Sequence, residues 1–222
     1  MIISSLIAPA VQAAYLLVAL GTCAPESAPE LDFSFAAEDP LWNHARTSRQ
    51  LRGETPAVPG FPIAGGVTKS EIVDRYNVEV MMKRNRESGL QCVWPTKVKV
   101  SIRYSAEIFV AREFGKGGCG DAETRAHELR HVAVDRQELQ RALPRLRGRA
   151  AAAMLQAVPR GPTDDAGALR IRELLLKNVS RAVGDELEKV MARIKKRQAE
   201  IDTAAEYRRF SRACPGEPLF RR

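Results

Sequence analysis

Histidine and aromatic residues are scarce in this chain of 222 residues, which contains three histidines and 6% aromatic residues. The net charge of +8 is not accompanied by the pattern of aromatic residues that could stack on bases. The sequence therefore disfavours nucleic acid as a partner. Two interpretations of the basic charge are open: a solvated surface, or attraction to an anionic component of a cell envelope.

Long apolar runs are absent after residue 20, so no later segment is long enough to span a bilayer. Residues 1–20 are mostly apolar or small, as in a secretory signal, although the usual basic residues in front are missing. Val11-Gln12-Ala13 resembles a cleavage site, and Leu20-Gly21-Thr22-Cys23 resembles a lipoprotein box apart from its threonine. We expect residues 1–23 to be a signal peptide, a lipoprotein leader or an uncleaved membrane anchor. Each would export the domain to the periplasm, the envelope or the medium.

Cysteine pairs at metal-binding spacing are also absent, because none of the four cysteines belongs to a C-x-x-C. In an exported chain, four cysteines indicate disulfides. Cys92 begins the second strand that we expect, and Cys119 follows the third. These two ends are neighbours in an antiparallel meander, so we predict a Cys92–Cys119 disulfide, although the sequence alone leaves other pairings open.

Two of the three histidines belong to the segment His127-Glu128-Leu129-Arg130-His131, an H-E-x-x-H. Acidic residues just before it suit the first turn of a helix. On a helix, a spacing of four places both imidazoles on one face, one turn apart, where they could bind one zinc ion at about 2.0–2.1 Å. Glu128 would then lie beside a zinc-activated water and act as its general base. The alternatives are a surface helix with coincidental histidines and a metal site without catalysis.

The rest of the chain predicts a linker and one α+β domain. Residues 24–66 are rich in proline and glycine, which is typical of a linker, and we expect His44 within it to be solvated. Residues 67–216 form the domain. Alternating apolar residues predict strands at 72–82, 92–104 and 106–113, with a turn at Ser105, arranged as a three-stranded antiparallel meander.

Two long helical segments follow these strands. The first begins near Asp121 and carries the H-E-x-x-H; Pro144 should break or kink it, and helix resumes at 145–158. The second runs over 166–201, with an apolar stripe that indicates packing on the first helix and the sheet. We therefore expect the meander to pack on a long helical hairpin.

The hairpin should bring residues near 200 alongside the histidines. Asp202 and Glu206 are thus candidates for the third metal ligand, with a slight preference for Glu206. Thr203 and Glu206 also fit a capping box, which is the alternative. Asp135 lies about 12 Å along the helix from His127 and is assigned to the surroundings of the site, or to an ion pair with Arg130 or Arg136. Tyr207 could donate a hydrogen bond to a developing oxyanion.

Taken together, these segments resemble a family of uncharacterised exported bacterial proteins that look like zincin-type, zinc-dependent proteases. The resemblance is carried by Cys92-Val93-Trp94, Ile108-Phe109-Val110-Ala111-Arg112-Glu113, Cys119, the run from His127 to Asp135, Ile201-Asp202-Thr203, Glu206-Tyr207 and Cys214. It implies a zincin-like fold with His127, Glu128 and His131 as site residues. The chain lacks both the extended metzincin motif and an N-E-x-x-x-D.

The sequence therefore predicts an exported zinc metallopeptidase that hydrolyses peptide bonds, with the substrate peptide added as a strand to the sheet edge. The alternative is a non-catalytic envelope protein whose basic helical hairpin binds an anionic or protein partner.

Overall fold

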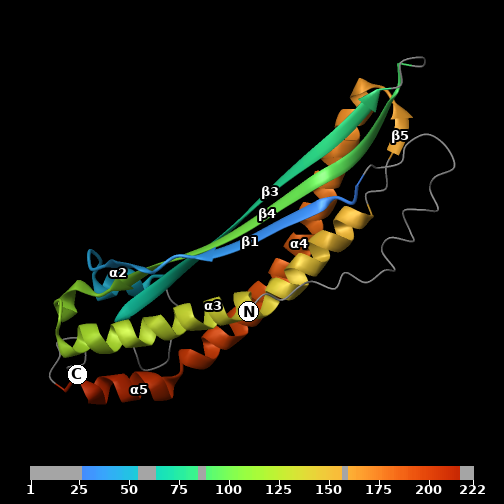
Figure 1. Cartoon of the computed structure of the whole chain (residues 1–222). Coiled ribbons are helices and arrows are strands. Elements are labelled where there is room, and N and C mark those ends of the chain that lie inside the picture. The colour runs from blue at the N-terminus through green and yellow to red at the C-terminus, as the bar shows by residue number, and fades with distance from the viewer. Residues whose placement is uncertain (1–26, 55–63, 85–88, 157–159, 216–222) are drawn as a thin grey trace, which may run out of the picture. The chain divides into compact units, whose positions relative to one another are not determined.

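The computed structural model describes residues 27–54, 64–84, 89–156 and 160–215, and it contains both helices and sheet, as expected for an α+β protein. The predicted leader lies outside the described residues. Among the residues described, no helix is both long enough and apolar enough to cross a membrane. The elements are β1 (Glu30–Ala37), β2 (Leu41–Asn43), α2 (Ser48–Arg52), β3 (Gly66–Arg84), β4 (Gln91–Val110), the 3-10 turn η1 (Arg112–Phe114), α3 (Cys119–Leu155), β5 (Arg160–Thr163), α4 (Asp165–Ile201) and α5 (Ala204–Ala213) (Figure 1).

The chain divides into two compact units. Of the described residues, 27–33, 75–84, 89–100, 147–156 and 160–184 form the first unit, and 34–54, 64–74, 101–146 and 185–215 form the second. The long elements β3, β4, α3 and α4 each contribute residues to both units. The H-E-x-x-H helix segment and residues near 202 belong to the second unit, which therefore holds the candidate site.

Strand β4 is the centre of the sheet. It pairs with β1, β2, β3 and β5, and β2 runs parallel to it with Trp42 opposite Ile108. Its side chains alternate between buried and exposed positions, with Val98, Val100, Ile102 and Tyr104 buried. This alternation confirms the strand that we predicted at 92–104, and it is what a half-buried strand requires.

The predicted turn at Ser105 is wrong, and so is the predicted disulfide. Strand β4 continues to Val110, and the alternation of burial also continues, with Ala106 and Ile108 buried. Nothing at Ser105 forces a turn, because neither glycine nor proline is present there. The predicted three-stranded antiparallel meander is therefore wrong, because its second and third strands are one strand, β4, and β2 pairs with β4 in parallel. Cys92 and Cys119 are not joined, and Cys119 is bonded to Cys214 instead.

The segment predicted as a linker, residues 24–66, contains β1, β2 and α2. In β1 every second residue is partly buried, and these are Leu31, Phe33 and Phe35. Helix α2 has a capping box, in which the Thr47 side chain accepts from the backbone of Gln50 and the Gln50 side chain accepts from the backbone of Thr47. The prolines obscured these signals because they lie between the elements.

The helices agree with the sequence except at Pro144. Helix α4 begins and ends within one residue of the predicted 166–201. Helix α3 runs through Pro144 without a break. Proline removes one backbone donor and crowds the preceding turn, but Ala142 and Leu146 on either side of it are fully buried. We infer that the packing of this face holds the helix together.

Contacts in the second unit show that α3 and α4 run in opposite directions. His131 contacts Gln198, Glu138 contacts Arg197, and farther along α3 Arg145 contacts Glu186. This register brings the end of α4 to the first turns of α3, where the H-E-x-x-H lies.

Candidate metal centre

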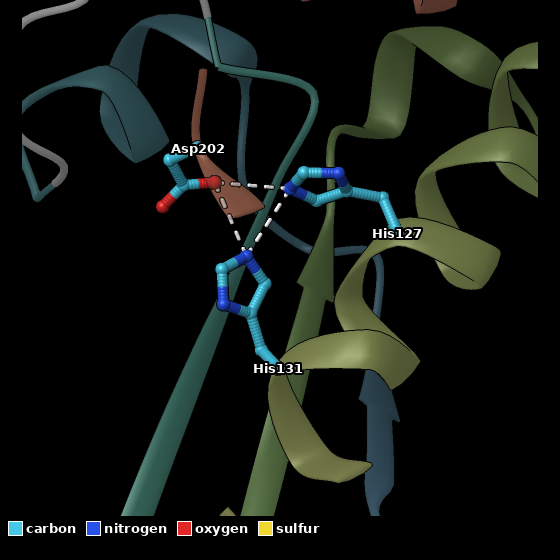
Figure 2. Close-up of side chains that lie close together, drawn as sticks. All are labelled: His127, His131 and Asp202. Carbon is cyan, nitrogen blue, oxygen red and sulfur yellow. Dashed lines mark hydrogen bonds and ion pairs between the residues drawn. The ribbon is translucent and has the colours of Figure 1, made fainter. Parts of the chain in front are cut away.

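Two imidazoles and one carboxylate meet at a single point in the second unit. His127 and His131 lie one turn apart on α3, and both rings direct Nε2 toward Oδ1 of Asp202 (Figure 2). The three donor atoms form a nearly equilateral triangle: the two Nε2 atoms are 3.1 Å apart, and Oδ1 is 3.1 Å from His127 and 3.2 Å from His131. These three residues form a group that could hold a metal ion.

The size and chemistry of this triangle fit zinc. Zinc–nitrogen and zinc–oxygen bonds are about 2.0–2.1 Å long, so adjacent ligand atoms of a tetrahedral zinc stand about 3.3–3.4 Å apart. The observed separations fall just below this value. Two histidines and one carboxylate are also a common ligand set in catalytic zinc sites, where a fourth position stays open.

Asp202 reaches the site because it lies between two helices. Helix α4 ends at Ile201, and α5 begins after Thr203, whose side chain accepts a hydrogen bond from the backbone of Glu206. Thr203 therefore caps α5, which is one half of the capping box that the sequence suggested, whereas the Glu206 side chain pairs with Arg130 and Arg209. Asp202, the residue before the cap, faces the histidines. Burial acts to raise the pKa of Asp202, but its bonds to His127 and His131 outweigh this effect and hold the pKa well below its usual range.

Gln198 determines which ring nitrogen of His131 could bind a metal ion. Its amide nitrogen donates to the Asp135 carboxylate and to the His131 carbonyl oxygen, so its Oε1 faces Nδ1 of His131. A carbonyl oxygen only accepts, and Nδ1 must therefore carry the proton. This leaves the lone pair on Nε2, the atom that faces Asp202. Support of this kind from outside the ligand set is typical of metal-binding histidines.

Asp135 holds the Gln198 side chain in place. Its carboxylate accepts hydrogen bonds from Ser70 on β3 and Tyr104 on β4, in addition to the bond from Gln198. It is buried and contacts the site through Gln198 rather than directly. Its placement in the surroundings of the site agrees with the sequence analysis. The ion pairs suggested for it there are not among its contacts.

Glu206 lies on the opposite edge of the His127 ring from Asp202. Its Oε1 is 3.4 Å from Nδ1 of His127, and its carboxylate pairs with Arg130 and Arg209. The arginines, Arg209 first, hold the pKa of Glu206 at about 2. Nη2 of Arg130, which can only donate, lies 2.9 Å from the same Nδ1, so Glu206 and Arg130 favour opposite tautomers of His127. The structure thus brings Asp202 to the group of donor atoms. Glu206, the slightly preferred candidate for the third ligand, contacts His127 at Nδ1 instead.

Glu128 is buried beside the histidines, with 4% of its surface exposed. Its carboxylate accepts a hydrogen bond of 2.8 Å from the Thr68 hydroxyl on β3. Burial raises the pKa of Glu128, although the neighbouring histidines partly oppose this. Gly66 allows the close approach of β3, because a Cβ there would lie 2.7 Å from Oε1 of Glu128 and 2.5 Å from Thr124. A carboxyl group with a raised pKa near a metal site is suited to proton transfer.

The group of donor atoms opens into a cleft of about 520 Å³. Helix α3 supplies one wall with His127, Glu128, His131 and Asp135. The other walls are formed by residues 66–68, 70 and 72 of β3 and by one face of α4, and the lining also includes Tyr207. The half-buried ring of Tyr207 lies 6.4 Å from that of His127. Burial raises the pKa of its hydroxyl to about 12, so Tyr207 remains a hydrogen-bond donor at neutral pH.

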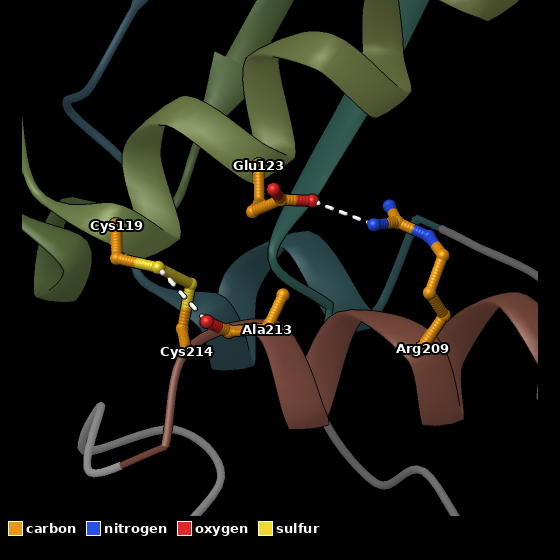
Figure 3. Close-up of a disulfide and its surroundings, with 5 residues drawn as sticks. All are labelled: Cys119, Glu123, Arg209, Ala213 and Cys214. Atoms are coloured by element: carbon orange, nitrogen blue, oxygen red, sulfur yellow. Dashed lines mark hydrogen bonds and ion pairs between the residues drawn. A yellow bond between two sulfur atoms is a disulfide. The ribbon is translucent and has the colours of Figure 1, made fainter.

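A disulfide joins the helix of the histidines to the helix that follows Asp202. Cys119 begins α3 and Cys214 follows α5, and the bond spans 95 residues of sequence (Figure 3). Arg209 of α5 also pairs with Glu123 of α3 at 2.9 Å. The ring of Phe210 lies 6.0 Å from that of Phe114. Helix α5 is therefore fastened to α3, and this fixes Asp202 opposite the histidines.

Replacing both Cys119 and Cys214 with serine should weaken metal binding as well as stability. Removing a native disulfide typically lowers the free energy of unfolding by about 2–5 kcal/mol, and a loop of this size lies near the upper end of that range. We also expect the affinity for a divalent metal to fall about tenfold, the lower end of what loss of outer support costs a metal site. Thermal unfolding and metal titration measure the two effects. An unchanged affinity in the folded variant would contradict the positioning role of the disulfide.

His44 is bonded to protein rather than solvated, which corrects the sequence analysis. Its Nε2 lies 2.7 Å from the Asp121 carboxylate at the start of α3, and its side chain is 14% exposed. This contact attaches the segment after β2 to the same helix. It is separate from the group of donor atoms, so the third histidine of the chain has a structural position.

Sequence reasoning missed Thr68, Gln198, Ser70 and Tyr104. Only Gln198 gave a signal, because it precedes Asp202 by four residues and so shares its helix face. The others depend on the register between β3, β4 and α3. Comparisons with protein-family models, curated proteins and solved structures find no match to this chain.

Proposed function

We propose that this protein is an exported zinc-dependent metallopeptidase. The observation that carries the proposal is the triangle of His127, His131 and Asp202 beside a buried Glu128, in the lining of a cleft. The spacing of the donor atoms lies just below that of a tetrahedral zinc site, and three protein ligands would leave one position for water or substrate. Export is inferred from the apolar residues 1–20, and the Cys119–Cys214 disulfide is compatible with it.

The residues of the cleft have separate roles in this proposal. Zinc, when bound, supplies Lewis acidity that makes a water nucleophilic near neutral pH and polarises a carbonyl group. Glu128 accepts a proton from the attacking water and passes it to the leaving amine, as its burial and raised pKa allow. Thr68 holds the carboxylate in place. Tyr207 donates a hydrogen bond to the oxygen on which negative charge develops.

Strand β3 provides a surface for an extended substrate. Among the described strands, β3 pairs only with β4, and its residues Gly66, Thr68, Ser70 and Ile72 line the cleft. A peptide could therefore align with β3 by strand addition, in which backbone hydrogen bonds give affinity without requiring a particular sequence. The substrate class that follows is an extended peptide or an unfolded protein segment.

Metal removal tests this function. We expect the purified protein to contain one zinc ion per chain and to cleave members of an unbiased peptide library. A chelator should abolish cleavage, and added zinc should restore it. At zinc concentrations 1,000 times the dissociation constant, the metal contributes about 4 kcal/mol, so chelation should lower the melting temperature by about 10 °C.

The same experiment distinguishes the peptidase from the alternative, which is a non-catalytic envelope protein that binds an anionic or protein partner through basic helices. Much of the basic charge that α3 and α4 carry in the second unit is already paired, since Glu138 contacts Arg141, Arg193 and Arg197. A protein that retains no zinc, and whose melting temperature ignores both chelator and zinc, would favour the alternative over the peptidase.

A further inference from the structure

The lining of the cleft becomes less polar with distance from the donor atoms of His127, His131 and Asp202. Near His127 it is lined by carboxylates and hydroxyls, whereas farther along α4 its lining is formed by Met191, Ile194 and Lys195. Ile72 of β3 also belongs to the apolar part. Met191 is 48% exposed, so this apolar surface is open to a ligand.

Lys195 is the only lysine or arginine among the residues that line the cleft. It has no carboxylate partner within the part of the chain that the structure describes. Its neighbours on α4 differ, since Arg193 and Arg197 both pair with Glu138. The cationic groups near His127 are also occupied, because Arg130 and Arg209 both pair with Glu206. Lys195 is thus an exposed charge that a ligand in the cleft could neutralise.

The distance from Lys195 to the metal group sets where that ligand charge must lie. Seven residues separate Lys195 from Asp202, which corresponds to about 10 Å along a helix axis. An extended peptide advances about 3.3 Å per residue. A peptide bond placed at the His127–His131–Asp202 group would therefore bring a group about three residues away to Lys195, with apolar side chains over Met191 and Ile72 between them.

We propose that Lys195 forms a substrate subsite that binds a carboxylate about three residues from the scissile bond. The proposal rests on the proposed function and names its substrate class: extended peptides with an apolar segment followed by an acidic side chain or by the terminal carboxylate. Both sources present the same chemistry to the ammonium group. Met191 and Ile194 select for the apolar segment.

Binding measured without turnover tests the subsite. The zinc-loaded Glu128→Gln protein is titrated with fluorescent peptides of one length that carry Asp or Asn three residues from the centre, on either side, with amidated ends. A further Asn peptide ends three residues from the centre in a free carboxylate, which tests the second source. We expect the best carboxylate peptide to bind about five- to tenfold more tightly than its neutral counterpart, the range for a hydrogen bond to a charged group at a partly exposed site.

Matched variants identify the residue responsible. Lys195→Met should abolish the preference for a carboxylate, and Lys195→Glu should reverse it in favour of a peptide with Lys at the same position. Lys196→Glu makes the same charge change one residue away, outside the cleft lining, and should retain the preference. Equal binding of all the peptides, or a preference that survives in Lys195→Met, would overturn the proposal.

Failure of the subsite and failure of the proposed function give different results, because binding does not require hydrolysis. If the wild-type protein cleaves no peptide but the Lys195-dependent preference is found, the peptidase proposal fails and the subsite remains. If peptides are cleaved and Lys195→Met leaves the preference unchanged, the subsite fails and the peptidase remains.

Discussion

Replacing either His127 or His131 with alanine is expected to abolish zinc retention during purification. Each imidazole supplies one of only three protein donor atoms in the group, and Asp202 and the other histidine would be left as a two-ligand site. Loss of a residue that only supports a metal ligand typically costs about 10–100-fold in affinity, so loss of a ligand itself should cost more than about 100-fold. Metal analysis of the purified variants measures the loss, and zinc should no longer raise their melting temperatures.

The third histidine provides the control. His44→Ala removes an imidazole that contacts Asp121 at the start of α3 and lies apart from the donor atoms. We expect this variant to keep one zinc ion per chain, with some loss of stability because the Asp121 carboxylate loses a buried partner. If His44→Ala lost zinc as completely as His127→Ala, the assignment of the ligands would be wrong.

Patterns within one segment of the sequence predicted several helices and strands well. Contacts between segments far apart in the sequence were predicted poorly. Helix α4 was predicted to within one residue because its apolar stripe persists over ten turns. The turn at Ser105 was wrong because alternation of apolar residues continues across it, and period alone does not show where one strand ends and another begins. The Cys92–Cys119 pairing depended on that turn, so one local error became an error in topology.

The same difference applies to the candidate site: residues close in sequence were predicted, and the ligand from a distant segment was not fixed. His127, Glu128 and His131 come from a single helical turn, and their mutual geometry follows from the helix period alone. Asp202 and Glu206 could be narrowed to a pair because α4 returns antiparallel to α3. The choice between them depended on the end of α4 at Ile201, which turns Asp202 toward Nε2 and Glu206 toward Nδ1 of His127. Sequence patterns do not fix a helix end to one residue.

The burial of the Glu128 carboxylate lowers the stability of the fold. A carboxylate that is 4% exposed loses most of its solvation, and its Thr68 hydrogen bond and the nearby histidines offset only part of that loss, since its pKa remains raised. Folding alone would favour a neutral side chain at this position. In the proposed function this carboxylate accepts a proton, so the buried group that costs stability is the one that the reaction needs.

Replacing Glu128 with glutamine should therefore separate catalysis from stability. The amide has the same shape and can still accept from Thr68, but it is unable to accept a proton from water. We expect kcat to fall by about 10²–10⁴-fold, the usual contribution of general acid–base catalysis. Zinc content should stay at one ion per chain, because the three donor atoms are untouched. The melting temperature of the metal-free protein should not fall, since a buried charge has been removed.

Thr68→Val is the matched control for the Glu128→Gln comparison. It removes the hydroxyl that donates to the Glu128 carboxylate and leaves the carboxylate itself in place. An intermediate loss of kcat is expected, because the base is present but less well oriented. A Glu128→Gln protein that cleaves peptides as fast as the wild type would show that another group accepts the proton. In that case the burial of Glu128 beside His127 and His131 would need a structural explanation.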